Sequence, residues 1–258
     1  MTKRILLTTL IVLLSGSILG CYFYFTSRLV SEGQQQARCR KVEVILLDSL
    51  ESHIVDKAEM HRMLAKQSIG KQIDSIDLHA LETQVRGMGE VVSAQVYTAD
   101  DRTLAVQITQ RKPVIRFEDG KAHWYADPEG YLFPVRNPAD VPVVTGQIPL
   151  QLESGYKGFA PAAERNWTCS MVELARYIDS KPVLKREITQ LDIAANGDIV
   201  LYTRTPGPSI IFGDACDYVT KFQKLDAWWR NIEPQLDEKK HYKTINLKYN
   251  QQIICRQL

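Results

Sequence analysis

The chain has 258 residues, of which 45% are hydrophobic and 24% charged, and its 32 Lys and Arg against 30 Asp and Glu give a formal net charge of +2. These values are typical of a globular protein and argue against a disordered chain, a collagen-like repeat or a multi-pass membrane protein. A net charge this close to zero gives no support for nucleic-acid binding, which favours a basic domain.

An uncharged segment stands near the N-terminus. Residues 5–25, ILLTTLIVLLSGSILGCYFYF, carry no charged side chain. A helix of this length reaches about 31 Å, close to the thickness of the hydrocarbon core of a bilayer. We expect a transmembrane helix over 5–27, with 1–4 as a cytoplasmic tail. A cleaved signal peptide and a lipoprotein signal acylated at Cys21 stay open, although the aromatic residues at 22–25 favour the membrane span.

The linker and the cysteines come next. Residues 28–39 are polar and predict a linker that holds a folded domain off the membrane. The four remaining cysteines form no closely spaced pair, which argues against a zinc site. Disulfides and buried free thiols both stay open for these four residues, which are Cys39, Cys169, Cys216 and Cys255.

A small α+β domain is predicted over 40–111. Alternating apolar residues indicate strands at 41–47, 91–97 and 103–109, with Val92, Ala94 and Val96 on one face of the second. Asp56 begins one predicted helix, and Ser75 or Asp77 begins another. The order is β-α-α-β-β, in which two helices cover one face of a three-stranded sheet.

Residues 112–258 predict a second, β-rich domain with two helices. Gly, Pro and Asn-Gly turns separate its short alternating segments. The predicted helices are 166–178 and 215–232, and adjacent Trp228 and Trp229 cannot share one helical face, so we expect one in the core and the other exposed or at an interface. The predicted strands are 113–117, 122–126, 131–134, 141–144, 187–193, 198–203, 209–212, 242–249 and 252–256.

The sequence predicts no catalytic, cofactor or metal site. It contains no GxSxG elbow, P-loop or HExxH motif, and its five histidines are scattered. Asp127 and Glu129 flank Pro128 in a predicted turn, which accounts for both carboxylates without chemistry.

The order of these parts resembles one known family. The segments that carry the resemblance are GEVVSAQVYTADDRTLAVQITQRKPVIRF, WYADPEGYLFP, PVVTGQ, SIIFG and INLKYNQQIICR. Together they resemble the FtsQ/DivIB family of bacterial division proteins, although Asn246 stands where that family usually has an acid. The resemblance implies a POTRA domain at 40–111, a β domain at 112–258 and a non-enzymatic scaffold without a small-molecule substrate. It also implies placement in the inner membrane at the division site, with both domains periplasmic, and regulation of septal wall synthesis through FtsB- and FtsL-like bitopic partners.

The C-terminal hairpin is the predicted partner-binding site. A strand near the chain end often lies at a sheet edge, where a partner strand can add. The resemblance also places partner binding here, and we expect Pro or charge-reversal variants of Leu247 or Tyr249 to stay folded but lose the partner. The predicted partner-binding residues are Tyr242, Lys243, Ile245, Leu247, Lys248, Tyr249, Gln252, Ile254 and Arg256.

A different class of function stays open. Cys21 would support a lipid-anchored envelope protein that uses its POTRA-like module for assembly or transport. An acylated Cys21 at the mature N-terminus is the expected sign of that alternative.

Overall fold

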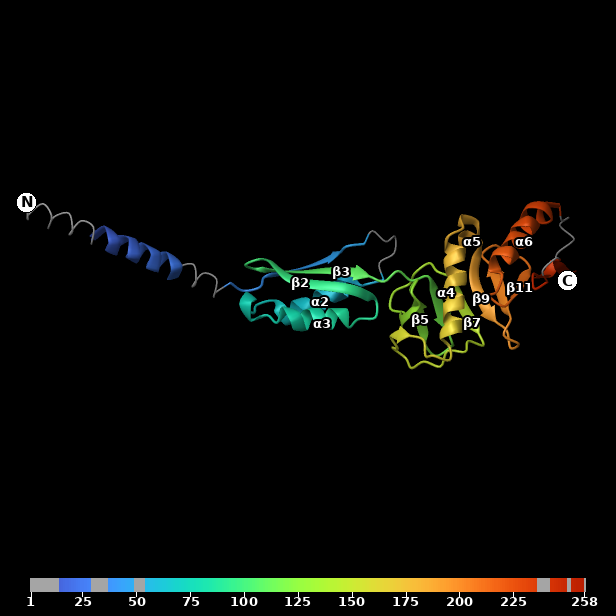
Figure 1. The fold of residues 1–258 in the computed structure, drawn as a ribbon, viewed down its shortest axis with the longest axis horizontal. Coiled ribbons are helices and arrows are strands. Elements are labelled where there is room, and N and C mark those ends of the chain that lie inside the picture. The colour runs from blue at the N-terminus through green and yellow to red at the C-terminus, as the bar shows by residue number, and fades with distance from the viewer. Residues whose placement is uncertain (1–13, 29–36, 49–53, 236–241, 250–251, 258) are drawn as a thin grey trace, which may run out of the picture. The chain divides into compact units, whose positions relative to one another are not determined.

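The computed structural model describes residues 14–28, 37–48, 54–235, 242–249 and 252–257 (Figure 1). Its chain divides into two compact units, which are treated separately below. The first contains residues 1–47, 57–86 and 93–108, and the second contains 48–56, 87–92 and 109–258.

Residues 14–28 form a helix whose apolar side chains are exposed. Leu14, Ile18 and Leu19 are 55–66% exposed, and the four aromatic residues at 22–25 are 62–67% exposed. Across the described ranges, no helix is both long enough and apolar enough to cross a membrane. Residues 5–13 of the predicted span lie outside the described residues.

The first unit carries the predicted β-α-α-β-β order. Its sheet has the strand order β1-β3-β2, and β1 pairs with β3 in parallel, with Val42 opposite Leu104 and Val44 opposite Val106. The two α-helices lie along one face of this sheet (Figure 1). The elements are β1 Lys41–Leu46, α2 Lys57–Ser68, η1 Ile73–Ser75, α3 Leu78–Arg86, β2 Val91–Asp100 and β3 Thr103–Gln110.

Local contacts explain where these elements begin. Asp77 caps α3, because its Oδ1 accepts the backbone N–H of Ala80 at 2.9 Å, whereas Ser75 ends the preceding 3-10 turn. The prediction that Val92 shares one face with Ala94 and Val96 is wrong, since Val92 is 54% exposed whereas Ala94 and Val96 are buried. The buried residues of β2 are Val91, Ala94 and Val96. The step from Val91 to Ala94 is three residues instead of two, and this shifts the alternation of buried and exposed side chains by one position.

The second unit is built on a ten-stranded sheet with the order β13-β12-β11-β10-β9-β7-β4-β5-β6-β8. An α+β class is therefore correct for both units. The strands are β4 Ile115–Glu118, β5 His123–Ala126, β6 Tyr131–Pro134, β7 Val143–Gly146, β8 Gly158–Phe159, β9 Ile188–Ile193, β10 Ile199–Thr203, β11 Ser209–Gly213, β12 Tyr242–Asn246 and β13 Ile254–Gln257.

Helices α4 (Arg165–Asp179) and α6 (Tyr218–Asn231) contribute to one apolar core with the strands. Tyr177 of α4 stacks on Phe222 of α6, with ring centroids 5.5 Å apart. The prediction of two helices missed α5, Pro182–Glu187, which begins with a proline in its first turn, and a 3-10 turn η2, Glu233–Gln235. It also missed the two-residue strand β8.

Candidate functional site

The C-terminal hairpin ends the ten-stranded sheet. Strand β12 pairs in parallel with β11 and antiparallel with β13, so among the described residues β13 is the edge strand at this end of the sheet. The predicted strand 242–249 is shorter in the structure, because the β12 ladder ends at Asn246. The backbone available for an added strand therefore belongs to 254–257 and not to 242–246.

Two predicted contact residues lie in the core. Ile245 and Leu247 are both 0% exposed and belong to the main apolar cluster. Tyr242 is half-buried, with its ring centroid 6.4 Å from that of Trp228. The partner contact predicted for Ile245 and Leu247 stays a prediction, and neither residue offers an exposed side chain for it. The expectation that a disruptive Leu247 variant stays folded has lost its basis for the same reason.

The outward-facing residues form the accessible part of the predicted site. Tyr249 is 49% exposed and Ile254 is 45% exposed. Cys255 is partly buried against the core, so the alternation of β13 turns Ile254 and Arg256 to the opposite face. The exposed members of the predicted set, besides Lys248, are Lys243, Tyr249, Gln252, Ile254 and Arg256.

Lys248 has a structural partner. Its Nζ lies 2.8 Å from Oδ2 of Asp198, which is next to β10, and this hydrogen bond lowers the pKa of the Asp198 carboxyl. Its aliphatic chain passes directly over Gly213, where a Cβ would lie only 2.8 Å from Cγ of Lys248. Lys248 thus fixes the chain that leaves β12 against the strands beside it.

Lys224 of α6 holds the same segment from the helix side. Its Nζ donates to the backbone oxygens of Leu247 at 2.9 Å and Tyr249 at 2.6 Å. Burial is the main cause that lowers the pKa of the Lys224 ammonium group. These two bonds satisfy carbonyls beyond the end of the β12 ladder and set the position of Tyr249.

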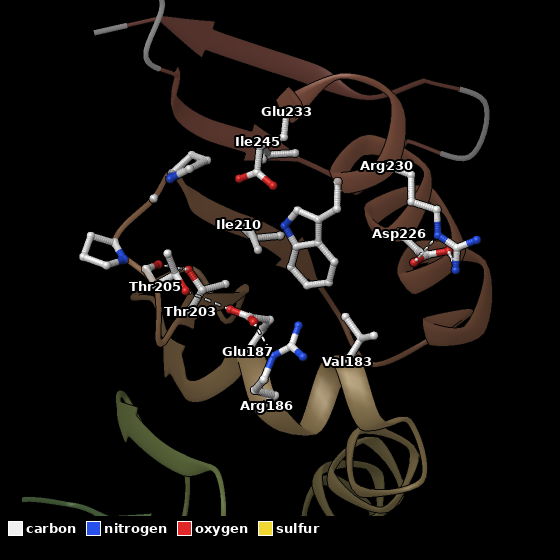
Figure 2. Close-up of a pocket in the computed structure, with 14 residues that line it drawn as sticks. Val183, Arg186, Glu187, Thr203, Thr205, Ile210, Asp226, Arg230, Glu233 and Ile245 are labelled. Atoms are coloured by element: carbon white, nitrogen blue, oxygen red, sulfur yellow. Dashed lines mark hydrogen bonds and ion pairs between the residues drawn. The ribbon is translucent and has the colours of Figure 1, made fainter. Parts of the chain in front are cut away.

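A pocket of about 330 Å³ lies beside β12 (Figure 2). Ile210 of β11 and Ile245 of β12 are buried at its floor, and Val183 of α5 and Trp229 of α6 add apolar walls. Trp228 is 1% exposed whereas Trp229 is only partly buried, so one tryptophan enters the core and the other reaches a surface, as the helix geometry predicts.

Charged residues form the rim of this pocket. Glu187 accepts hydrogen bonds from Arg186 Nε at 2.8 Å and from Thr205 Oγ1 at 3.1 Å, and Arg230 pairs with Asp226 at 2.9 Å. The bond from Arg186 lowers the pKa of Glu187. Burial, and secondarily the charge of Glu187, raises the pKa of Glu233. The rim therefore contains both signs of charge around an apolar floor.

Asp127 has a structural role in a buried ion pair. Its side chain is 2% exposed, and Oδ2 lies 2.5 Å from Nη1 of Arg111. Oδ1 accepts the backbone N–H groups of Glu129 and Tyr131 at 3.1 and 2.9 Å. The guanidinium of Arg111 also covers the Tyr131 ring at 3.7 Å. These contacts explain the burial of the Asp127 carboxylate and its position in the turn.

The five cysteines are all free thiols, and Cys39 is buried. Within the described ranges, no group of three or more His, Cys, Asp and Glu side chains could hold a metal ion.

The pocket was not predicted from the sequence. Its lining comes from α5, residues 203–208, β11, α6, η2 and β12, so residues between 183 and 245 contribute to it. The only available signal was the Trp228-Trp229 pair, because one member of an adjacent pair on a helix must leave the buried face.

Two family models match the chain. The model described as FtsQ/DivIB, C-terminal related, matches residues 112–256, which is more than half of the sequence. A model described as POTRA-like domain matches residues 37–109. A comparison with curated proteins finds no match.

Proposed function

The chain belongs to the FtsQ/DivIB family, and from this premise we propose that it is a non-enzymatic scaffold of the bacterial divisome. In this proposal it is anchored in the inner membrane with both domains in the periplasm. It binds FtsB- and FtsL-like partners at the division site and thereby helps to regulate septal wall synthesis.

The observation that carries the proposal is the open edge of β13. In the described part of the chain this strand pairs only with β12, and it displays Ile254 and Arg256 on its accessible face. A partner strand added here would gain affinity from main-chain hydrogen bonds and specificity from alternate side chains. Residues 247–249, which follow β12, are held by Lys224 and by the bond from Lys248 to Asp198, and this supports the strand that β13 pairs with.

The neighbouring pocket offers the same partner a place for a side chain. Its floor residue Ile245 lies opposite Cys255 of β13, so the pocket and the edge share one region of the sheet. An apolar or aromatic group placed beside Trp229 would be buried in a pre-formed concave site, which is how interface anchors gain most of their energy.

The N-terminal helix supports the membrane part of the proposal. Residues 14–25 carry no charged side chain, and their large apolar and aromatic side chains are exposed, which suits a lipid environment better than water. The helix continues beyond Cys21 to Arg28, and this continuity favours an anchor over a processed lipoprotein. Mass spectrometry of the mature N-terminus checks the alternative, since an acylated Cys21 as first residue would replace the single-pass anchor in this proposal.

The test is capture of the partner by the full-length chain in detergent. Ile254→Asp places a charge on the β13 surface, and we expect at least a tenfold loss of affinity for an FtsB–FtsL-like complex. Val219→Asp is the matched control, because Val219 is similarly exposed, at 42%, near the start of α6. Equal binding by both folded variants and the wild type would contradict strand addition at β13.

A further inference from the structure

A second open edge lies in the POTRA-like unit. Strand β1 stands at the end of the order β1-β3-β2, and no described strand pairs with its outer side. A groove of about 730 Å³ runs between this edge and α2. It is lined by Val42–Ile45 of β1 and by Lys57, Ala58, His61 and Arg62 of α2.

The register shows which backbone groups face the groove. Lys41 N–H donates to Arg102 O at 3.2 Å, and Leu47 N–H donates to Ile108 O at 2.9 Å. Because peptide groups alternate along a parallel ladder, the odd-numbered residues of β1 face β3. The N–H and C=O groups of Val42, Val44 and Leu46 therefore point to the open edge, where they can pair with an added strand.

The charges beside this edge are mainly positive. Glu43 is already paired with Lys41, whose Nζ lies 2.5 Å from Oε1. Lys57 and Arg62 are exposed on α2, and neither has a carboxylate partner among the described residues. His61 is exposed between them. The groove thus combines unpaired main-chain groups, an apolar strand surface and a basic wall.

We propose that this groove binds an extended segment of a second protein that carries acidic side chains and adds as a fourth strand beside β1. Its backbone pairs with Val42, Val44 and Leu46. Its carboxylates face Lys57 and Arg62. This site is separate from the C-terminal hairpin and does not depend on the partner proposed for it.

The test uses the full-length chain in detergent and a fluorescently labelled, capped peptide of sequence Val-Glu-Val-Thr-Val-Glu. Anisotropy should show saturable binding below about 1 mM, and the Lys57→Glu/Arg62→Glu double variant should lose at least tenfold in affinity. Lys66→Glu is the matched control, because Lys66 is exposed on the same helix but does not line the groove. A peptide with lysine in place of glutamate should bind more weakly than the acidic peptide.

Two peptides with N-methyl groups at alternate positions test the strand geometry. One methylated set should abolish binding and the other should leave it nearly unchanged, because only alternate N–H groups of an added strand face β1. Hydrogen exchange should slow at Val42, Val44 and Leu46 when the unmodified peptide is bound. Equal effects of both methylated sets, or equal loss in Lys66→Glu, would overturn the proposal.

Sedimentation of the chain without peptide tests whether a second copy of the chain occupies the groove. A monomer supports a free groove, whereas a dimer that dissociates in the Lys57→Glu/Arg62→Glu variant would show that a second copy covers it. That result would overturn the assignment to an acidic partner. Absence of saturable binding by the acidic peptide to the folded monomer would overturn it as well.

Discussion

The edges at β13 and β1 present the same backbone chemistry in different surroundings. At β13, lysines secure the adjoining chain from within the unit, and exposed Ile254 and Arg256 are left for a partner. At β1, a groove separates the strand from a helix whose lysine and arginine are free of carboxylate partners in the described ranges. In both proposals the main-chain groups permit strand addition, and the neighbouring side chains determine which partner can be added.

The largest expected effect comes from a variant that removes core packing in the unit with the β13 edge and leaves the unit with the β1 edge unchanged. Leu247→Ala should lower the free energy of unfolding of the second unit by about 2–5 kcal/mol, because Leu247 is fully buried beneath the hairpin. Urea unfolding of the full-length chain measures the change. Binding of the acidic peptide at β1 should persist where the first unit remains folded. Equal loss of binding at both edges, with the first unit still folded, would show that the two edges do not respond separately to Leu247→Ala.

A smaller effect is expected at Gly213. Its φ is +82°, and an added Cβ would lie 2.8 Å from Lys248 Cγ. Gly213→Ala should therefore destabilise the unit by about 1–2 kcal/mol through the left-handed backbone, with displacement of Lys248 in addition. Gly197→Ala provides the control, since Gly197 also has positive φ but no atom lies within 4 Å of the position that its added Cβ would take. Partner affinity should fall more in Gly213→Ala than in the control.

The smallest effect is a pH dependence at the C-terminal hairpin. The hydrogen bond from Lys248 lowers the folded-state pKa of Asp198. Its stabilising contribution is therefore present above the unfolded pKa of about 3.9 and is lost as pH falls through the lower folded value. Asp198→Asn should reduce the melting temperature slightly at neutral pH and show less acid dependence in this range. An identical slope for the wild type and the variant would show that the pair contributes nothing.

Alternation along the chain was enough to predict most of the strands. The parallel strand β1 and the hairpin strands β9 and β10 follow from apolar periodicity and from the turn at Asn196-Gly197. Helix α5 was not predicted because its six residues are too few to show a helical period. Strand β8 was not predicted because two residues show no alternation.

The location of the C-terminal edge required tertiary information. Sequence alternation correctly marks Ile245 and Leu247 as one face, but it does not say whether that face meets a core or a partner. The parallel pairing of β11 with β12 decides this, because it places β12 inside the sheet and leaves β13 outside. The pocket is likewise made by helices and turns that only the folded chain brings together.

The parallel β11–β12 pair also has a consequence for the folding route. The chain must pass through α6 before β12 can join β11, whereas β10 and β11 can pair as near neighbours in sequence. Loop closure across α6 delays the later pairing, since its entropic cost comes before the contacts form. Until then β11 is itself an open edge that carries Ile210 and Phe212. Pairing of β12 with β11 therefore covers an edge that would otherwise be open to strand addition by another chain.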